Sequence, residues 1–271
     1  MKVVTTSLPD VPLVLVTVAA TQGSAPREAG AWMAVSSNEV SGTIGGGHLE
    51  FEAIAEARRR LGNPGVAVEA ERTWSLGPGL GQCCGGVMRL RFERFEAAEL
   101  PTLQARVAPR LAPLAIFGGG HVGKALVNVL ATLPFEITWI DSRDEIFPDE
   151  LPEHVQCEHS DPVQAAVADL ETGSRVLIMS FSHAEDLDIV AACLRRQRAE
   201  ADLPYIGLIG SKTKWATFRH RLEERGFTDE DFAHITCPIG LPGIAGKEPE
   251  VIAVSVAAQI LQIAPPGDGP R

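Results

Sequence analysis

The chain has few cysteines and no long apolar run. Cysteine accounts for five of the 271 residues. The number is odd and the residues are scattered apart from one adjacent pair, which excludes a disulfide framework and is typical of a reducing compartment. No apolar run approaches the roughly 18 residues that span a bilayer. We therefore expect a cytoplasmic protein that does not enter a membrane.

Basic residues are also in the minority. Lysine and arginine number 24 against 35 acidic residues, which gives a formal net charge of −11. An acidic surface repels phosphate backbones, and no basic and aromatic cluster stands against it, so we expect no nucleic-acid partner. Hydrophobic residues make up 45% of the chain, enough to fill a core, and the length favours two domains.

The apolar run at residues 11–20 has two interpretations. It ends in small residues, as the core of a secretory signal does. However, Lys2 is the single basic residue before it and Asp10 adjoins it, which is unlike a signal peptide. We therefore interpret the run as a strand.

Residues 1–95 are expected to form a small α+β domain. Residues 48–61 have apolar residues at helical spacing and a basic end, which predicts a helix. Val-rich or alternating segments predict strands at 13–20, 31–35, 40–44, 66–74 and 87–92. The hydrophobic pattern weakens over residues 96–113, which are rich in Ala, Glu, Pro and Arg. We predict that this segment is a linker, part of which fits a short helix.

From residue 114 strands and helices alternate. Strands are predicted at 114–117, 136–140, 155–158, 175–180 and 205–209, and helices at 122–133, 162–171, 185–198, 212–225 and 250–261. This alternation predicts an α/β fold, in which the small N-terminal α+β domain is followed by a Rossmann-like, doubly wound parallel sheet over residues 114–264. Residues 265–271 are expected to be a mobile tail.

A dinucleotide fingerprint opens this second domain. Gly118, Gly120 and Gly123 fit Gly-x-Gly-x-x-Gly between an apolar strand and an amphipathic helix, which is the context that suits a pyrophosphate. Asp141 follows the next strand, where a carboxylate can accept hydrogen bonds from a ribose. Arg143 leaves the choice between NAD and NADP open. The same glycines also occur in related folds where they serve only the turn.

Three further polar residues are predicted at the same sheet edge. His183 lies just beyond one predicted strand, and Ser211 and Lys212 lie between the next strand and its helix. Ligands of open α/β sheets bind at the carboxyl ends of the strands. Each residue also has a plain structural explanation, Ser211 as a helix N-cap and His183 as a hydrogen-bonded loop residue.

The most distinctive segment is rich in glycine and holds two adjacent thiols. Gln82, Cys83, Cys84 and Gly85 form its centre. Thiolates suit a soft transition metal or a sulfur-rich ligand, but two adjacent cysteines alone cannot make a tetrahedral zinc site. The alternative is that the cysteines are small core residues.

Taken together, these motifs resemble the XdhC/CoxI family of xanthine dehydrogenase accessory proteins. The blocks that carry the resemblance span nearly the whole chain: Gly23-Ser24-Ala25-Pro26-Arg27 with Gly30, Gly42-Thr43-Ile44-Gly45-Gly46-Gly47 with Glu50, Gly81-Gln82-Cys83-Cys84-Gly85-Gly86, the Gly118 fingerprint with Asp141, Tyr205-Ile206-Gly207-Leu208-Ile209-Gly210-Ser211-Lys212, and Cys237-Pro238-Ile239-Gly240-Leu241.

The resemblance implies a maturation factor rather than an enzyme. Such a factor binds molybdenum cofactor (molybdopterin), shelters it while a cysteine desulfurase installs its terminal sulfur, and delivers it to xanthine dehydrogenase. By position, Cys83 and Cys84 would contact the cofactor and its molybdenum, with Gln82 and Gly85 framing them, and Arg27 would bind the phosphate. A homodimer is also expected.

Two other functions remain open from the sequence. One is an NAD(P)-dependent oxidoreductase that uses Gly118, Gly120, Gly123 and Asp141, with His183 as acid or base. Ala184 follows His183 where many relatives carry an acidic residue, a departure that weakens an acid–base or metal-ligand role for His183. The other is a scaffold that bridges desulfurase and dehydrogenase without binding either ligand.

Overall fold

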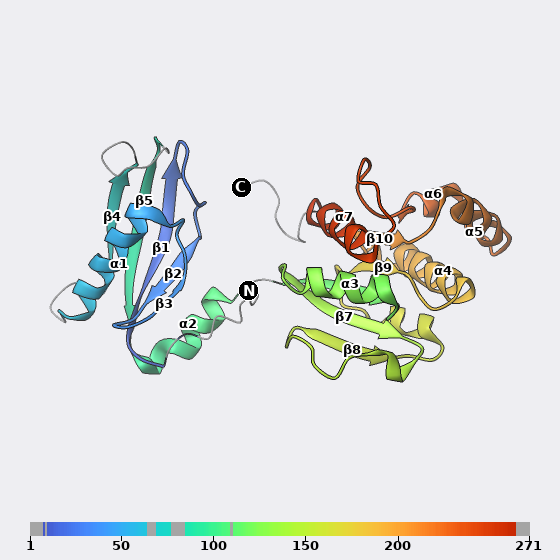
Figure 1. Ribbon diagram of the computed structural model, residues 1–271, viewed down its shortest axis with the longest axis horizontal. Helices are drawn as coiled ribbons and strands as arrows, with labels where there is room; N and C mark the ends of the chain where they lie inside the picture. The colour runs from blue at the N-terminus through green and yellow to red at the C-terminus, as the bar shows by residue number, and fades with distance from the viewer. Residues whose placement is uncertain (1–7, 9, 64–68, 77–84, 109–110, 264–271) are drawn as a thin grey trace. The chain divides into compact units, whose positions relative to one another are not determined.

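The computed structural model describes residues 8, 10–63, 69–76, 85–108 and 111–263. The chain divides into two compact units, Val4–Pro109 and, in the main, Arg110–Arg271 (Figure 1). The predicted mobile tail, 265–271, and the residues Gln82, Cys83 and Cys84 lie outside the described residues. Among the helices that the structure describes, none has both the length and the apolar character to cross a membrane.

The N-terminal unit is built on a five-stranded antiparallel sheet. Its order is β3-β2-β1-β5-β4, with bounds Leu13–Gln22 (β1), Trp32–Val35 (β2), Val40–Gly42 (β3), Glu69–Ser75 (β4) and Val87–Phe95 (β5). The apolar run that resembles a signal core is therefore the central strand. Alternation turns Val14 and Val16 to one face and Leu13 and Leu15 to the other, and all four are buried, so both faces of this strand need apolar residues.

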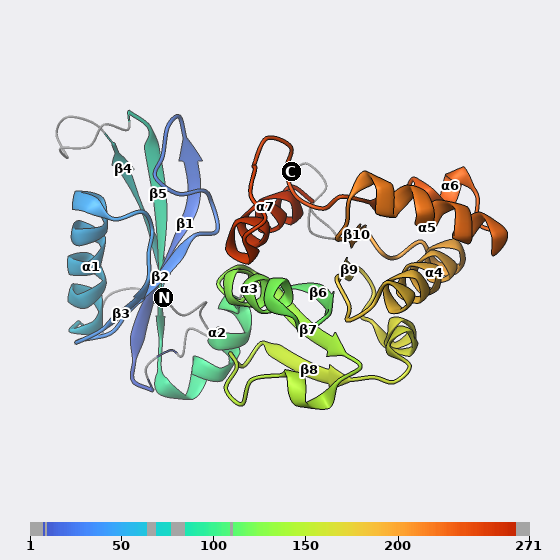
Figure 2. The same ribbon diagram turned by 45° about the vertical axis from the view of Figure 1, so that its right-hand side comes forward.

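Each face of this sheet carries a helix. The helix α1 (Gly47–Leu61) packs Leu49, Ala53 and Ala57 against the first face. On the second face, the short helix η2 (Ala97–Glu99) leads into α2 (Leu100–Val107), which packs Leu100 and Leu103 against the strand. Figure 2 shows the two helices on opposite sides of the sheet.

The position of α2 changes the expected boundary between the domains. We expected a linker over 96–113, but η2 and α2 occupy most of that segment and α2 belongs to the core of the N-terminal unit. This unit therefore extends to Pro109 instead of ending at residue 95. The first strand of the second unit begins at Ala112.

The C-terminal unit confirms the predicted doubly wound parallel sheet. Its order is β11-β10-β9-β6-β7-β8, with bounds Ala112–Phe117 (β6), Phe135–Asp141 (β7), Val155–His159 (β8), Arg175–Ile178 (β9), Tyr205–Leu208 (β10) and Ile235–Thr236 (β11). The described pairings are all parallel. The strand order reverses between β6 and β9, so loops that leave these two strands flank a crevice of the kind that binds ligands in such folds.

Helices cover both faces of the parallel sheet (Figures 1 and 2). On one face α3 (His121–Leu130) packs against α7 (Pro249–Leu261). The other face carries α4 (His183–Glu200), α5 (Lys212–Glu224) and η4 (Val163–Asp169). The predicted helix at 162–171 is a 3₁₀ helix, and two short elements, η3 (Asp144–Ile146) and α6 (Asp229–Phe232), were not predicted, although a capping box at Thr228 and Asp231 marks the start of α6.

Two fingerprint glycines are required by the fold itself. A Cβ added at Gly123 would lie 1.9 Å from the carbonyl oxygen of Gly118, and a Cβ at Gly118 would lie 2.1 Å from the carbonyl oxygen of Met179. The indole of Trp139 donates to that same Gly118 carbonyl at 3.0 Å. These contacts hold helix α3 directly on the turn that follows β6.

We predict that Gly123→Ala destabilises the protein by at least about 2 kcal/mol, because the added methyl group has no space in a packed interior. Gly120→Ala is the matched control, since no described atom lies within 4 Å of a Cβ there. Urea unfolding of both variants measures the difference. Equal stability of the two would show that the Gly118 turn can relax.

Candidate functional sites

Three of the N-terminal motifs meet at one end of the antiparallel sheet. A Cβ added at Gly23 would lie 3.2 Å from the Cα atom of Gly86, and one at Gly45 would lie 2.6 Å from the Cβ atom of Pro26. Leu76 N donates to the carbonyl of Gly86 at 2.7 Å. The loops at 22–30 and 42–47 and the described ends of the Gly/Cys segment therefore pack together. We call this region the motif-loop end.

Part of the motif-loop end is already occupied by the protein's own carboxylate. Glu50, on α1, accepts hydrogen bonds from Thr43 Oγ1 at 2.5 Å, Ile44 N at 3.0 Å and Gly46 N at 3.1 Å. Burial raises the pKa of Glu50, but these hydrogen bonds outweigh burial and lower the pKa below its ordinary value. The N–H and O–H donors of the loop at 43–46 are thus bonded to Glu50, which stabilises the loop. An external anion would have to compete with Glu50 for these donors.

Other parts of the motif-loop end are open. A Cβ added at Gly30, Gly46 or Gly85 would meet no described atom within 4 Å. The side chain of Arg27 is exposed, and its Cγ atom lies 3.3 Å from the Cβ position of Gly45. Gly46 and Gly85 therefore present bare backbone, and Arg27 presents an exposed side chain beside the Gly45 loop.

The second group of predicted residues lies at the carboxyl edge of the parallel sheet. Gly118 and Gly120 follow β6, and Gly120 is the N-cap of α3. Asp141 ends β7, and His183 begins α4 after β9. Ser211 is the N-cap of α5, and Lys212 is its first residue. The sheet thus brings these six residues to a single edge.

The hydrogen-bonding capacity of Asp141 is largely used inside the protein. Its carboxylate accepts from Gly119 N at 2.6 Å and from the backbone N, Nε and Nη2 atoms of Arg143 at 2.9, 2.8 and 2.9 Å. Burial raises the pKa of Asp141, but the hydrogen bonds from Arg143 and Gly119 lower it by more than burial raises it. The pKa therefore lies below its ordinary value. A ribose hydroxyl would have to displace Arg143 to reach this carboxylate.

His183 and Ser211 show ordinary helix-start geometry. The ring of His183 is exposed and lies edge-on to Phe218, with centroids 6.3 Å apart. Ser211 Oγ accepts from Lys214 N at 3.1 Å, which is an N-cap bond. The predicted structural explanation for Ser211 therefore holds, whatever else this residue binds.

A buried ion pair at this edge was missed from the sequence. Asp186 accepts from Lys214 Nζ at 2.6 Å and from the backbone N and Oγ atoms of Ser180 at 2.8 and 2.7 Å. Lys214 Nζ also donates to the carbonyl of Ile209 at 2.8 Å. The pair joins the loops that follow β9 and β10. An acidic residue in a first helical turn usually serves the helix dipole, so the sequence gave no signal for this role.

The described residues contain no group of three or more His, Cys, Asp or Glu side chains that could hold a metal ion. Cys193 is fully buried, and burial raises the pKa of its thiol to about 12, so this cysteine is a core residue. Within the N-terminal unit, any role for thiols in ligand binding must rest on Cys83 and Cys84.

We predict that Asp141→Asn destabilises the protein at neutral pH by about 2 kcal/mol, the scale of lost charge-assisted hydrogen bonds in a buried site. Since the folded-state pKa of Asp141 is depressed, its stabilisation is present above the ordinary value of 3.8 and is lost as the pH falls through the folded-state pKa. The stability gap between parent and variant should therefore close in acid.

Urea unfolding at neutral pH and at about pH 3 measures this gap, with the exposed Asp149→Asn as control. A gap of equal size at both pH values would show that Asn disturbs packing rather than charge.

Comparison with known proteins bears on both units. Residues 114–260, more than half of the chain, match the family model of the XdhC Rossmann domain. Residues 9–69 match the model of the XdhC and CoxI family. The two matches therefore cover the loops at 22–30 and 42–47 of the motif-loop end and the carboxyl edge of the parallel sheet.

Individual relatives agree with this. The uncharacterised protein YqeB of Escherichia coli (strain K12) is 27% identical over 254 residues. That alignment covers 93% of this chain but only 43% of YqeB, so the chain spans less than half of its relative's length. A Bacillus halodurans protein described as a xanthine dehydrogenase has the same fold, with a TM-score of 0.78 and 20% identity over 97% of this chain and 95% of the other. With its Rossmann domain matched over more than half of the sequence and residues 9–69 matched as well, this chain belongs to the XdhC and CoxI family.

Proposed function

We propose that this protein is a maturation factor that binds molybdenum cofactor, protects it while a cysteine desulfurase adds the terminal sulfur, and delivers it to xanthine dehydrogenase. The observation that carries the proposal is the convergence of three motifs at the motif-loop end, beside the two described ends of the Cys83-Cys84 segment. Membership of the XdhC and CoxI family supports the same role.

The chemistry of the cargo fits the groups at the motif-loop end. Molybdenum cofactor carries a dithiolene, an oxidisable metal centre and a phosphate. The exposed guanidinium of Arg27 suits the phosphate, and the side-chain-free backbone at Gly46 and Gly85 admits a bulky ligand. The thiols of Cys83 and Cys84 are soft donors that suit molybdenum or its transferable sulfur.

A carrier also has to release its cargo. The formal net charge of −11 repels an anionic ligand, so binding must rest on local groups such as Arg27. Glu50 contributes one more negative charge at the motif-loop end and holds donors that a phosphate could otherwise use. We infer that the net negative charge and Glu50 keep the affinity for the cofactor moderate. A moderate affinity suits transfer of the cofactor to a second protein.

The carboxyl edge of the parallel sheet supports a carrier over an NAD(P)-dependent oxidoreductase. Asp141 is held by Arg143 and Asp186 by Lys214, so neither carboxylate is poised to bind a ribose or to move a proton. The neighbours of His183 are Ala184 in the sequence and the ring of Phe218 in space, and neither is an acidic residue. We accordingly expect no tight binding of NADH or NADPH.

Replacing the paired thiols tests the proposal. We expect the double variant Cys83→Ala, Cys84→Ala to retain at least about tenfold less cofactor after anaerobic purification, a loss of roughly 1.4 kcal/mol in binding. Cofactor is measured as the fluorescent pterin released by oxidation. Cys157→Ala, an exposed cysteine of the other unit, is the matched control and should retain the parent amount.

Three outcomes would contradict this picture in different ways. Equal retention by parent and double variant would remove the cysteines from the site. If the parent carried no pterin but quenched NADH fluorescence on binding, the oxidoreductase would replace the carrier, and binding of neither ligand would favour a scaffold.

A further inference from the structure

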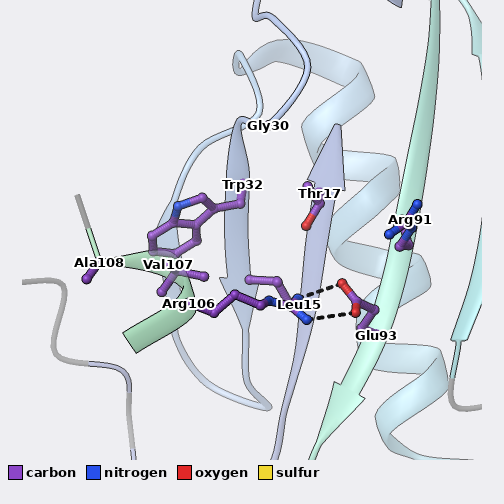
Figure 3. Close-up of a pocket in the computed structure, with 9 residues that line it drawn as sticks. All are labelled: Leu15, Thr17, Gly30, Trp32, Arg91, Glu93, Arg106, Val107 and Ala108. Carbon is purple, nitrogen blue, oxygen red and sulfur yellow. Dashed lines mark hydrogen bonds and ion pairs between the residues drawn. The ribbon is translucent and has the colours of Figure 1, made fainter. Parts of the chain in front are cut away.

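A hollow of about 520 Å³ lies in the N-terminal unit, on the sheet face opposite α1. Its volume is in the range of small-molecule sites. Leu15 and Thr17 of β1 and Arg91 of β5 line its floor, and the end of α2 forms one side (Figure 3). The function proposed above makes no use of this hollow.

Two glycines of the sequence motifs shape the hollow. Gly42 has φ +81°, and a Cβ there would lie 2.7 Å from the carbonyl oxygen of Trp32 and 3.2 Å from its indole Cε3 atom. The Trp32 ring can therefore lie against the Gly42 backbone, where it forms a flat wall. Gly30, with φ +92°, also lines the hollow, and a Cβ there would meet no described atom within 4 Å.

A fixed carboxylate and guanidinium stand opposite the indole. Figure 3 shows Arg106 extending from α2 across Leu15 to Glu93 on β5. The two side chains form a bidentate pair, with bonds of 3.0 and 2.7 Å, and the Arg106 guanidinium also lies 5.2 Å from the centre of the Phe95 ring. Each oxygen of Glu93 accepts one of these bonds and keeps a further lone pair for a ligand.

A second guanidinium borders the same hollow. Arg91 donates from Nε and Nη2 to Glu71, both at 3.2 Å. A guanidinium has five N–H donors, so these two bonds leave donors for a ligand. The Thr17 hydroxyl lies on the floor between Trp32 and Arg91 (Figure 3).

This lining selects a particular ligand chemistry. A flat indole wall and an aliphatic floor suit a planar ring, while Glu93 excludes a plain polyanion. A carboxylate can accept hydrogen bonds from an amino group and a neighbouring ring N–H, and a guanidinium beside it can donate to an adjacent oxo group. The 2-amino-4-oxo edge shared by pterins and guanine has this pattern.

We propose that the hollow binds the 2-amino-4-oxo edge of a planar heterocycle, with the ring against Trp32, the amino edge on Glu93 and the oxo group on a guanidinium. This inference rests on the proposed function, because the cargo of that function contains a pterin. The hollow would be the binding site of that pterin on the N-terminal unit. A free guanine nucleotide carries the same edge and is the other source of this chemistry.

Fluorescence polarisation with pterin-6-carboxylic acid tests the proposal on the full chain, with guanosine monophosphate as competitor. Glu93→Gln keeps the shape of the side chain but replaces one acceptor by a donor, and we expect at least about tenfold weaker pterin binding. Arg91→Gln should weaken binding as well. Arg89→Gln is the matched control, because Arg89 lies on the same strand and also pairs with Glu71 but does not line the hollow, and it should bind as the parent does.

The outcomes separate this inference from the proposed function, because cofactor retention is measured on the same proteins. A parent that retains cofactor yet does not bind free pterin, or equal binding by parent, Glu93→Gln and Arg91→Gln, would overturn the hollow as the pterin site and leave the carrier role intact. Tighter binding of guanosine monophosphate than of pterin would assign the hollow to a guanine ligand and break its link with the cargo. Weaker pterin binding in both variants but not in Arg89→Gln supports the proposal.

Discussion

Close backbone contact at glycine is the constraint on which the rest of this structure depends. In the C-terminal unit Gly123 packs on the carbonyl of Gly118, and Gly118 packs on that of Met179, so helix α3 and strand β9 are both held to one turn. In the N-terminal unit Gly45 packs on Pro26 and Gly23 on Gly86, which brings three loops to one end of the sheet. At Gly123, Gly118 and Gly45 a Cβ would overlap a backbone or ring atom, and at Gly23 it would make a contact tighter than ordinary packing.

The protein uses its own carboxylates where similar folds bind ligands. Glu50 takes the backbone donors of the Gly45 loop, Asp141 takes Gly119 N, and Asp186 takes Ser180 N. Each of these groups orders a loop through hydrogen bonds to backbone N–H groups. Among the motif glycines, open space remains at the Cβ position of Gly30, Gly46 and Gly85 in the N-terminal unit and of Gly120 in the C-terminal unit. The internal use of Asp141 is the feature that weighs against a dinucleotide on the parallel sheet.

Much of the fold could be predicted because its strands and helices carry strong local patterns. The alternation after residue 114 indicated the parallel sheet. It also correctly predicted that Asp141, His183 and Ser211 lie at one edge of this sheet. Helix α2 was obscured because it is only eight residues long and packs just three apolar side chains, Leu100, Leu103 and Val107, against the core. The Asp186 to Lys214 pair could not be predicted, since its partners lie 28 residues apart and meet only through the packing of α4 and α5.

The sequence by itself determined the family resemblance, the α/β class and the presence of a Gly/Cys segment, because these depend on residue types at short spacings. The tertiary structure decided how the candidate residues are used. It showed that Asp141 is bound by Arg143 and Glu50 by the loop at 43–46, and that Trp32, Glu93 and Arg106 enclose one hollow. Hydrogen-bond partners and cavity walls come from elements far apart in the chain, so no local pattern specifies them.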